Sequence, residues 1–214
     1  MGSLRSARVL VVGASGHARV CIEALHDSGH MVVGCVSRDG VGAIGLPCPV
    51  IATDADLAAA AAACGADSAF VAIGDNAGRA AASERCAAAG LPLVNAISRF
   101  AMVSSSATLG RGVAILAGVV VNAGATVDDG VIVNTRASVD HDCSVGAFAH
   151  VAVGVSLAGG VRVGRQAFLG IGAAVLPGCV IGANSTVGGG AVVIADVAPG
   201  ITVVGVPARP VRPR

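Results

Sequence analysis

The chain has 214 residues, which is enough for two small domains. Its formal net charge is +1 and it contains no Trp or Tyr, so neither a basic nor an aromatic surface for nucleic acid is expected. Although 54% of the residues are apolar, no uninterrupted apolar run reaches the roughly 18 residues that a membrane-spanning helix needs. We therefore expect neither a nucleic-acid nor a membrane partner, and without a recognisable signal peptide we expect a cytoplasmic protein.

Residues 1–100 alternate short apolar strands with helical segments, which is typical of a small parallel α/β sheet. The expected strands are Arg8–Val12, His30–Val36 and Ser68–Ile73, and the expected helices are Ala18–Ser28, Ala55–Cys64 and Ala77–Ala89. The segment Pro92–Ser98 would then lead into a second domain.

A glycine-rich turn, Gly13–His17, follows the first expected strand. Backbone N–H groups at a helix N-terminus favour phosphate. The third glycine of a dinucleotide fingerprint is absent, and the second strand is followed by Ser37-Arg38 rather than by an acid for a ribose hydroxyl. The turn thus favours a diphosphate or nucleotide ligand over NAD, with an ordinary strand-to-helix turn as the alternative.

From Val103 to Val193 an aliphatic residue recurs at every sixth position, sixteen times without a gap. A small or short residue stands four places after each. A hexapeptide repeat predicts a parallel β-helix in which three units form one triangular coil, here over residues 101–198.

Glycine often follows the aliphatic residue directly, as at Gly110 and Gly164. We interpret these glycines as corner residues whose backbone angles are forbidden to other residues. The coils are expected to end at Pro199-Gly200, which leaves 199–214 as a C-terminal tail.

His141 stands between two aspartates in the third position of its repeat unit, which is expected to point outward near a turn. The coil period of eighteen places Ala123, Gly159 and Pro177 in the same column, so open space should surround the imidazole. A histidine beside a carboxylate, here Asp142, is suited to general-base catalysis. A solvated surface histidine is the alternative interpretation.

Two other chemistries receive less support from the repeat. The expected β-helix contains only His141 and His150, which argues against a three-histidine zinc site within one subunit, though a site shared between subunits stays open. His150 lies between Ile132 and Phe168 and is expected to be half-buried. Cys143 occupies an inward position, which favours direct attack over an acyl-cysteine. All seven cysteines, with no CxxC pair, are expected to be small core residues of a reduced protein.

With these motifs in view, the chain resembles the left-handed β-helix acetyltransferases that modify amino sugars carried on nucleotides, and most of all the perosamine and bacillosamine branches. The resemblance spans nearly the whole chain. Its motifs are Gly13–His17, Asn134-Thr135, Val139–Cys143, Phe148–Val151, Phe168–Ile171, Gly188–Gly190 and Gly205–Arg209.

The resemblance implies a left-handed β-helix, acetyl-CoA as co-substrate, no metal, and a homotrimer with active sites at subunit interfaces. It implies that His141 is the catalytic base and Asp142 its acidic partner. Residues matching acetyl-CoA contacts are His150, Ile171 and Gly189. Residues assigned to the nucleotide sugar are Ser15, Gly16, His17, Ser37, Arg38, Gly74 and Asn134, although relatives often carry an acidic pair where this chain has Ser37-Arg38.

The implied reaction is acetylation of the C4 amine of a nucleotide-linked 4-amino-dideoxy sugar, with GDP-perosamine favoured. The alternatives are O-acetylation of a sugar hydroxyl, of the sialic-acid-modifying type, and a non-catalytic nucleotide-sugar-binding protein. Ile171 and Gly189 are eighteen residues apart and share one edge of the expected β-helix, whereas His141 lies on another. A neighbouring subunit is therefore expected to supply the CoA groove beside each His141.

Overall fold

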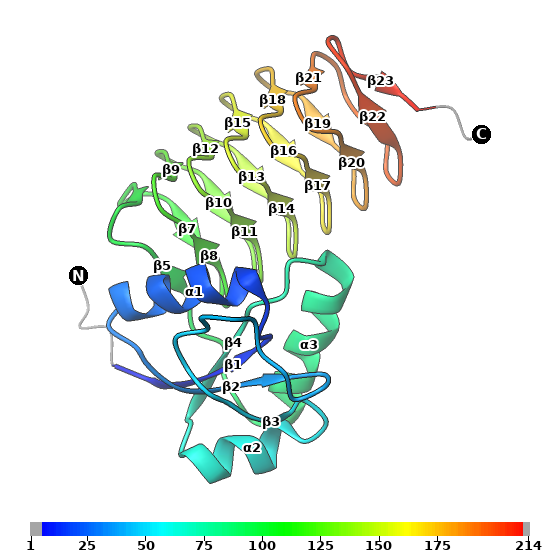
Figure 1. Cartoon of the computed structure of the whole chain (residues 1–214). Coiled ribbons are helices and arrows are strands. Elements are labelled where there is room, and N and C mark those ends of the chain that lie inside the picture. The colour runs from blue at the N-terminus through cyan, green and yellow to red at the C-terminus, as the bar shows by residue number, and fades with distance from the viewer. Residues whose placement is uncertain (1–5, 212–214) are drawn as a thin grey trace. The chain divides into compact units, whose positions relative to one another are not determined.

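The computed structural model describes residues 6–211, which divide into two compact units between Arg99 and Phe100. No helix in this range is long and apolar enough to cross a bilayer. The predicted fold class, a small parallel α/β sheet followed by a parallel β-helix, is confirmed (Figure 1).

The first unit is built on a parallel sheet with strand order β3-β2-β1-β4. The strands of this sheet are β1 (Arg8–Val12), β2 (Met31–Ser37), β3 (Val50–Thr53) and β4 (Ser68–Val71). The short strand β5 (Ala96–Ile97) follows them in the chain and is not part of this sheet. The helices of the first unit are α1 (Gly16–Asp27), α2 (Leu57–Cys64) and α3 (Asn76–Ala88). Strand β3 was not predicted, because it is a four-residue edge strand with no fully buried side chain.

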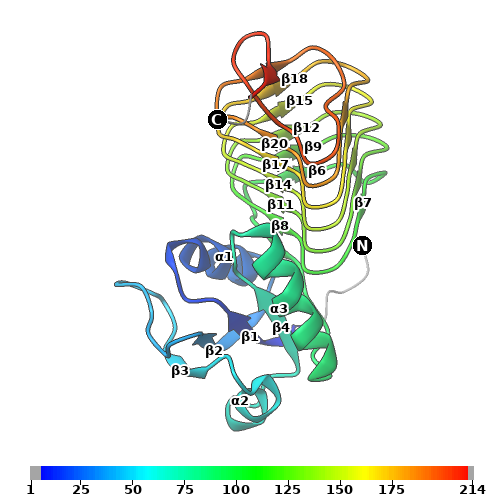
Figure 2. The ribbon, with the colours of Figure 1, turned by 90° about the vertical axis from the view of Figure 1, so that its right-hand side faces the viewer.

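The central strand β1 is apolar on both faces because helices cover both sides of the sheet (Figure 2). Leu10 and Val12 pack into a cluster with residues of α2 and α3. Val9 and Val11, which point the other way, are also fully buried, as is Ile22 of α1. The continuous apolar run in β1 follows from this two-sided burial.

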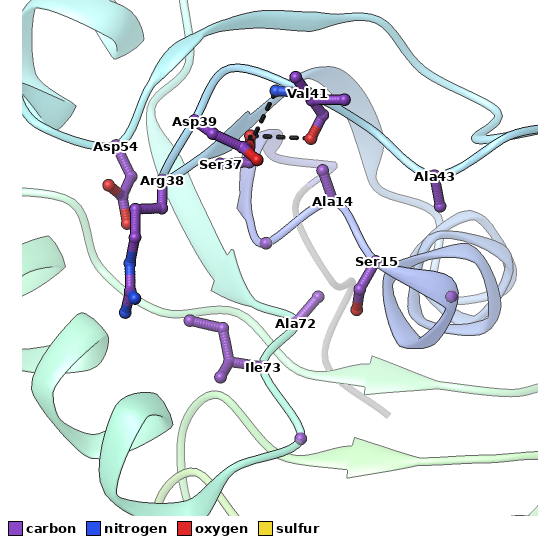
Figure 3. Close-up of a pocket in the computed structure, with 13 residues that line it drawn as sticks. Ala14, Ser15, Ser37, Arg38, Asp39, Val41, Ala43, Asp54, Ala72 and Ile73 are labelled. Carbon is purple, nitrogen blue, oxygen red and sulfur yellow. Dashed lines mark hydrogen bonds between the residues drawn. The ribbon is translucent and has the colours of Figure 1, made fainter.

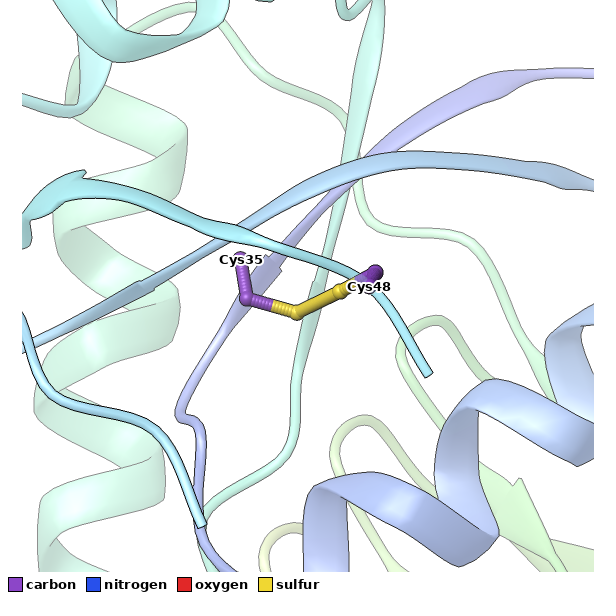
Figure 4. The surroundings of a disulfide bond; sticks show 2 residues. All are labelled: Cys35 and Cys48. Carbon is purple, nitrogen blue, oxygen red and sulfur yellow. A yellow bond between two sulfur atoms is a disulfide. The ribbon is translucent and has the colours of Figure 1, made fainter. Parts of the chain in front are cut away.

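A disulfide between Cys35 of β2 and Cys48 corrects the expectation that every cysteine is reduced (Figure 4). The Cα atoms are 6.5 Å apart across thirteen residues of sequence, and the Cys35 N–H donates to the Pro49 carbonyl at 2.9 Å. This pairing depends on how the loop returns to the sheet, so a search for a CxxC pair could not find it. The remaining described cysteines, Cys21, Cys64, Cys86, Cys143 and Cys179, are free thiols.

The second unit is a triangular β-helix with one parallel sheet on each face (Figures 1 and 2). The first face holds β7 (Thr108–Leu109), β10 (Thr126–Val127), β13 (Ser144–Val145), β16 (Arg162–Val163) and β19 (Val180–Ile181). The second holds β8 (Ala114–Ile115), β11 (Ile132–Val133), β14 (His150–Val151), β17 (Phe168–Leu169) and β20 (Thr186–Val187). The third holds β6 (Met102–Val103), β9 (Val120–Val121), β12 (Ser138–Val139), β15 (Ser156–Leu157), β18 (Ala174–Val175) and β21 (Val192–Val193).

The aliphatic residues of successive coils pair in register, eighteen residues apart, as the repeat predicts. On the second face, Val133 pairs with Val151, which pairs with Leu169, and all three are fully buried. Each strand is too short to bury its own apolar side, so stacking makes the core.

The glycines that directly follow the aliphatic residues serve close packing, so the corner-angle interpretation is wrong for them. The left-handed backbone lies two residues further on, at a position that Gln166 occupies with φ 56°. A Cβ at Gly164 would instead lie 2.5 Å from the backbone nitrogen of Ala183 in the next coil. These glycines are required because consecutive backbones approach closely there.

Stacking continues past the expected break at Pro199. Strand β22 (Thr202–Val204) pairs parallel with β20, and Val203 is buried. Strand β23 (Arg209–Pro210) then folds back antiparallel on β22. The chain can leave the coil at Pro199 and return, because β22 needs only to be in register with β20 to extend the sheet.

Candidate active site

The first unit contains a pocket of about 580 Å³ at the carboxyl ends of β1, β2 and β4 (Figure 3). Ligands of open parallel sheets bind at this edge. The predicted residues Ser15, Gly16, Ser37, Arg38 and Gly74 all line it. The other lining residues are Gly13, Ala14, Asp39, Val41, Ala43, Asp54, Ala72 and Ile73.

Gly13 allows the chain to turn tightly at the base of this pocket. Its φ is +113°, and a Cβ there would lie 2.7 Å from the carbonyl oxygen of Ala72. Its N–H donates to the Val36 carbonyl at 2.8 Å. A side chain at this position would therefore push apart the strand ends that form the pocket.

Helix α1 begins in the pocket without a side-chain cap. Its N-cap residue Ser15 makes no capping hydrogen bond. By contrast, Asp56 and Asp75 cap α2 and α3 by accepting from the N–H groups of Ala59 and Gly78. An uncapped helix N-terminus that faces a pocket is suited to an anionic ligand such as a diphosphate.

The loop after β2 forms one wall of the pocket and is held by its own polar groups. Asp39 Oδ1 accepts from the Val41 N–H at 3.0 Å and lies 3.1 Å from Ser37 Oγ. The Val41 hydrogen bond is the main reason that the pKa of Asp39 lies below its ordinary value. The Ala43 N–H donates to the Ala14 carbonyl at 2.7 Å, which joins the loop to the glycine turn.

His17 is not among the residues that line the pocket. Its ring lies partly buried in the first turn of α1, with Nε2 3.4 Å from Cys21 Sγ. Burial, assisted by the positive charge of Arg79, lowers the pKa of His17 to about 4. The imidazole is therefore neutral at neutral pH.

In the second unit, His141 and Asp142 form an exposed pair on the turn after β12. Nδ1 of His141 donates to Asp142 Oδ2 at 2.8 Å, and the two side chains are 62% and 73% exposed. This hydrogen bond, followed by the charge of Asp140, raises the pKa of His141 above its ordinary value. Asp142 adopts a left-handed backbone, with φ 60°. The predicted outward orientation of His141 is confirmed.

The imidazole is not surrounded by open space on every side, because it lies against Gly159 in the next coil. A Cβ at Gly159 would lie 2.5 Å from Nε2 of His141. The missing side chain therefore leaves the space that the imidazole occupies, while Nδ1 is held by Asp142. This arrangement presents Nε2 as the nitrogen that can take a proton from a substrate.

Two residues that the sequence interpretation missed hold the backbone at His141. Asp140 Oδ1 accepts from the His141 N–H at 2.7 Å and from Asn122 Nδ2 at 2.8 Å. The His141 bond is the main reason that the pKa of Asp140 lies below its ordinary value. Asn122 precedes Asp140 by one coil, so the eighteen-residue period contained the signal for this contact.

The expectation that Cys143 points inward is confirmed. It is buried, and its thiol donates to the Ala158 carbonyl at 3.1 Å. Burial raises the pKa of the Cys143 thiol. Since the thiolate is the reactive form, Cys143 is poorly suited to carry an acyl group.

The residues assigned to acetyl-CoA lie on the second face and on the turn that follows it. Nδ2 of Asn134 lies 3.2 Å from Nε2 of His150, whose ring meets Phe168 edge-on at 5.4 Å. The Ile171 carbonyl accepts from the Gly190 N–H, which stacks Ile171 against Gly189. The structure therefore pairs His150 with Asn134 and stacks Ile171 on Gly189, and it places His141 on the turn after the third face.

Within residues 6–211, no group of three or more His, Cys, Asp or Glu side chains is arranged to hold a metal ion. The candidate polar residues occur in the pocket of the first unit, in the His141–Asp142 pair and in the Asn134–His150 pair.

Comparison with family models matches both units. Residues 8–86 match the PglD N-terminal domain, and residues 160–195 match the bacterial transferase hexapeptide, a model of six repeats. The two matched segments cover the pocket of the first unit and the part of the β-helix that contains Ile171 and Gly189.

Solved structures match nearly the whole chain. PerB from Caulobacter crescentus, a structure in complex with CoA and GDP-perosamine, is 43% identical over 96% of this chain and 97% of its own, with a TM-score of 0.91. The acetyltransferase domain of PglB from Neisseria gonorrhoeae, in complex with acetyl coenzyme A, is 36% identical over 96% of this chain and 100% of its own, with a TM-score of 0.89. WeeI from Acinetobacter baumannii, at 22% identity over 95% of this chain and 99% of its own with a TM-score of 0.83, shares the fold.

Proposed function

The chain belongs to the hexapeptide-repeat N-acetyltransferases of nucleotide-linked amino sugars, and from this premise we propose that it acetylates the C4 amine of GDP-perosamine with acetyl-CoA. The observation that carries the proposal is the exposed His141–Asp142 pair, in which Asp142 holds Nδ1 and the absence of a side chain at Gly159 leaves space for the imidazole. It occurs in a chain that matches an enzyme solved with CoA and GDP-perosamine along nearly its whole length.

In the proposed reaction the neutral C4 amine attacks the thioester carbonyl carbon of acetyl-CoA. A carbon–nitrogen bond forms, the carbon–sulfur bond breaks, and CoA leaves. Nε2 of His141 accepts the amine proton and delivers it to the departing sulfur, while Asp142 stabilises the imidazolium through Nδ1. Asp140 and Asn122 hold the His141 backbone during both proton transfers.

We assign the nucleotide half of the substrate to the pocket of the first unit. The uncapped start of α1 at Ser15 and Gly16 suits the diphosphate. Ser37, Arg38 and Gly74 line the remainder of the pocket and are proposed contacts of the nucleoside. His17 and Asn134 are proposed contacts of the sugar.

We assign acetyl-CoA to His150, Ile171 and Gly189. Ile171 presents an apolar side chain that is 65% exposed, and Gly189 has no side chain, so the column is a smooth surface for the pantetheine arm. Within one chain this column lies on a different turn from His141. We therefore propose a homotrimer in which one subunit supplies the base and its neighbour supplies the CoA surface, and an active monomer by solution mass would refute it.

We propose that the enzyme works in the cytoplasm, where acetyl-CoA and nucleotide sugars are made. The Cys35–Cys48 disulfide is unusual for that compartment, because cytoplasmic thiols are kept reduced. Cell fractionation combined with thiol labelling of the recovered protein tests the location and the state of the two cysteines together.

A thiol-release assay tests the reaction. Acetyl-CoA is offered with 4-amino sugars on GDP, UDP and dTDP, and with a nucleotide sugar that carries a C4 hydroxyl instead of the amine. We expect thiol release with GDP-perosamine and a product heavier by one acetyl group on nitrogen. Release only with the hydroxyl acceptor would indicate O-acetylation, and nucleotide-sugar binding without release would indicate a non-catalytic protein.

A further inference from the structure

Arg79 is the largest fully buried side chain in the described chain, at 1% exposure, and the reaction proposed above does not use it. It lies in the first turn of α3, near the carboxyl end of β4. Nη1 donates to the carbonyls of Ile73 and Gly74, each at 3.0 Å, and Nη2 donates to Asn76 Oδ1 at 2.9 Å. Burying a cation is unfavourable unless such acceptors surround it.

Two of the three acceptors of Arg79 belong to the wall of the nucleotide pocket. Ile73 and Gly74 both line it, whereas Arg79 does not. Because the guanidinium is buried, its effect on a ligand is exerted through the backbone of this wall. A single planar group thus ties helix α3 to the β4 side of the pocket.

We propose that Arg79 is a positioning residue that sets the Ile73–Gly74 wall of the nucleotide pocket and thereby determines affinity for the nucleoside diphosphate. This inference rests on the proposed function, since it assumes that the pocket binds that part of the substrate. Lysine would retain the charge but lacks the planar fork that serves two carbonyls and an amide together.

Arg79 also acts through its charge on His17, which lies in the first turn of α1. It contributes, after burial, to the low pKa of His17, about 4. Its own pKa, lowered by burial to about 10, still leaves it charged at neutral pH. His17 is therefore kept as a neutral imidazole that offers hydrogen bonds without adding a positive charge beside the sugar.

The experiment compares R79K and R79Q with S83A, which removes a neighbouring hydroxyl that bonds the Arg79 carbonyl and keeps the guanidinium. Binding of GDP alone is measured by calorimetry, together with the KM for each substrate. We expect R79K and R79Q to weaken GDP binding about tenfold or more, as the loss of charged hydrogen bonds predicts. The KM for acetyl-CoA and the affinity of S83A for GDP should stay close to those of the natural protein.

A titration of His17 by NMR reports the charge of Arg79 through the comparison of R79Q with R79K, because loss of packing would raise the pKa of His17 in both variants. Removal of the charge in R79Q should raise the pKa of His17, and R79K should raise it much less. GDP binding by R79K equal to that of the natural protein would overturn the inference. If R79K and R79Q both fail to fold, N76A is used instead, because it removes only the side-chain acceptor of Arg79. N76A must then weaken GDP binding for the inference to stand. A natural protein that binds none of GDP, UDP and dTDP would instead refute the proposed function.

Discussion

The two units present their functional groups in opposite ways. In the first unit, strand ends and loops enclose a pocket of about 580 Å³, and a glycine turn and an uncapped helix form its base. In the second unit, His141 and Asp142 are mostly exposed on the outside of a turn. The first arrangement offers a concave pocket within one chain, whereas the second offers a single exposed edge.

The difference follows from how each unit builds its core. An open parallel sheet leaves a crevice at the carboxyl ends of its strands. A β-helix fills its interior with stacked aliphatic residues such as Val133, Val151 and Leu169, so its ligand sites must lie outside. An outside site needs a second surface to exclude water, which is the physical reason for the proposed trimer.

Removal of the base on the exposed edge should have the largest effect. H141A is expected to lower turnover about 10²–10⁴-fold, the usual range for loss of a general base. GDP binding in the pocket of the first unit and the thermal midpoint should change little, because His141 is exposed. Steady-state kinetics with calorimetry checks this, and near-normal turnover would refute the assignment of His141.

The disulfide should matter in the first unit alone. C48S is expected to lower the free energy of unfolding by about 3 kcal/mol, the typical contribution of a cross-link that closes a loop of this length. GDP binding should also weaken, because Val41 and Ala43 of the closed loop line the pocket. The KM for acetyl-CoA should not change. Dithiothreitol should reproduce these effects in the natural protein and should have no effect on C48S. Alkylation of all seven cysteines in the unfolded protein without prior reduction would contradict the disulfide.

Two glycines of the β-helix form a matched pair that separates activity from stability. G159A places a methyl group against the flexible imidazole of His141, so turnover should fall about tenfold. The free energy of unfolding should change by less than about 1 kcal/mol, because the imidazole can move away. G164A places the same group against the backbone of Ala183, so stability should fall by about 1–3 kcal/mol. Chemical denaturation and kinetics on both variants check the pair, and equal effects of the two on stability would contradict it.

The pH dependence of turnover should sharpen the role of Asp142. His141 works as a base only when it is neutral, so activity must fall as the pH drops below its pKa. Since the hydrogen bond that Nδ1 of His141 donates to Asp142 raises that pKa, D142N should lower it and move the acidic limb of the profile to lower pH. Rates measured across pH at saturating substrates test the direction, and a limb that moves to higher pH would be inconsistent with this contact.

Much of the second unit was predictable because a six-residue period specifies both fold and orientation. It placed His141 outward and Cys143 inward, and the structure confirms both. The contact from Asn122 to Asp140 was implied by the same period, since the two residues are eighteen apart. The role of Gly164 was misread because the period shows where a glycine recurs but not which backbone lies opposite it.

The first unit was predictable as alternating strands and helices, yet its site was only partly so. The turn at Gly13 and the residues Ser15 and Gly16 were identified because phosphate-binding turns have a local pattern. The Cys35–Cys48 bond and the buried position of Arg79 were not, because no local sequence pattern records how the loop after Cys35 returns to the sheet or which side chain of α3 is buried.

The sequence by itself determined the order of the two units, the register of the β-helix and the outward position of His141. These properties arise from periodic burial of apolar residues, which local spacing records. Only the tertiary structure decided that the imidazole of His141 lies against Gly159, that Cys35 meets Cys48, and that the buried Arg79 donates to carbonyls of the pocket wall. Those properties arise from close approach between non-neighbouring backbones and side chains, and no local pattern specifies how near such groups come.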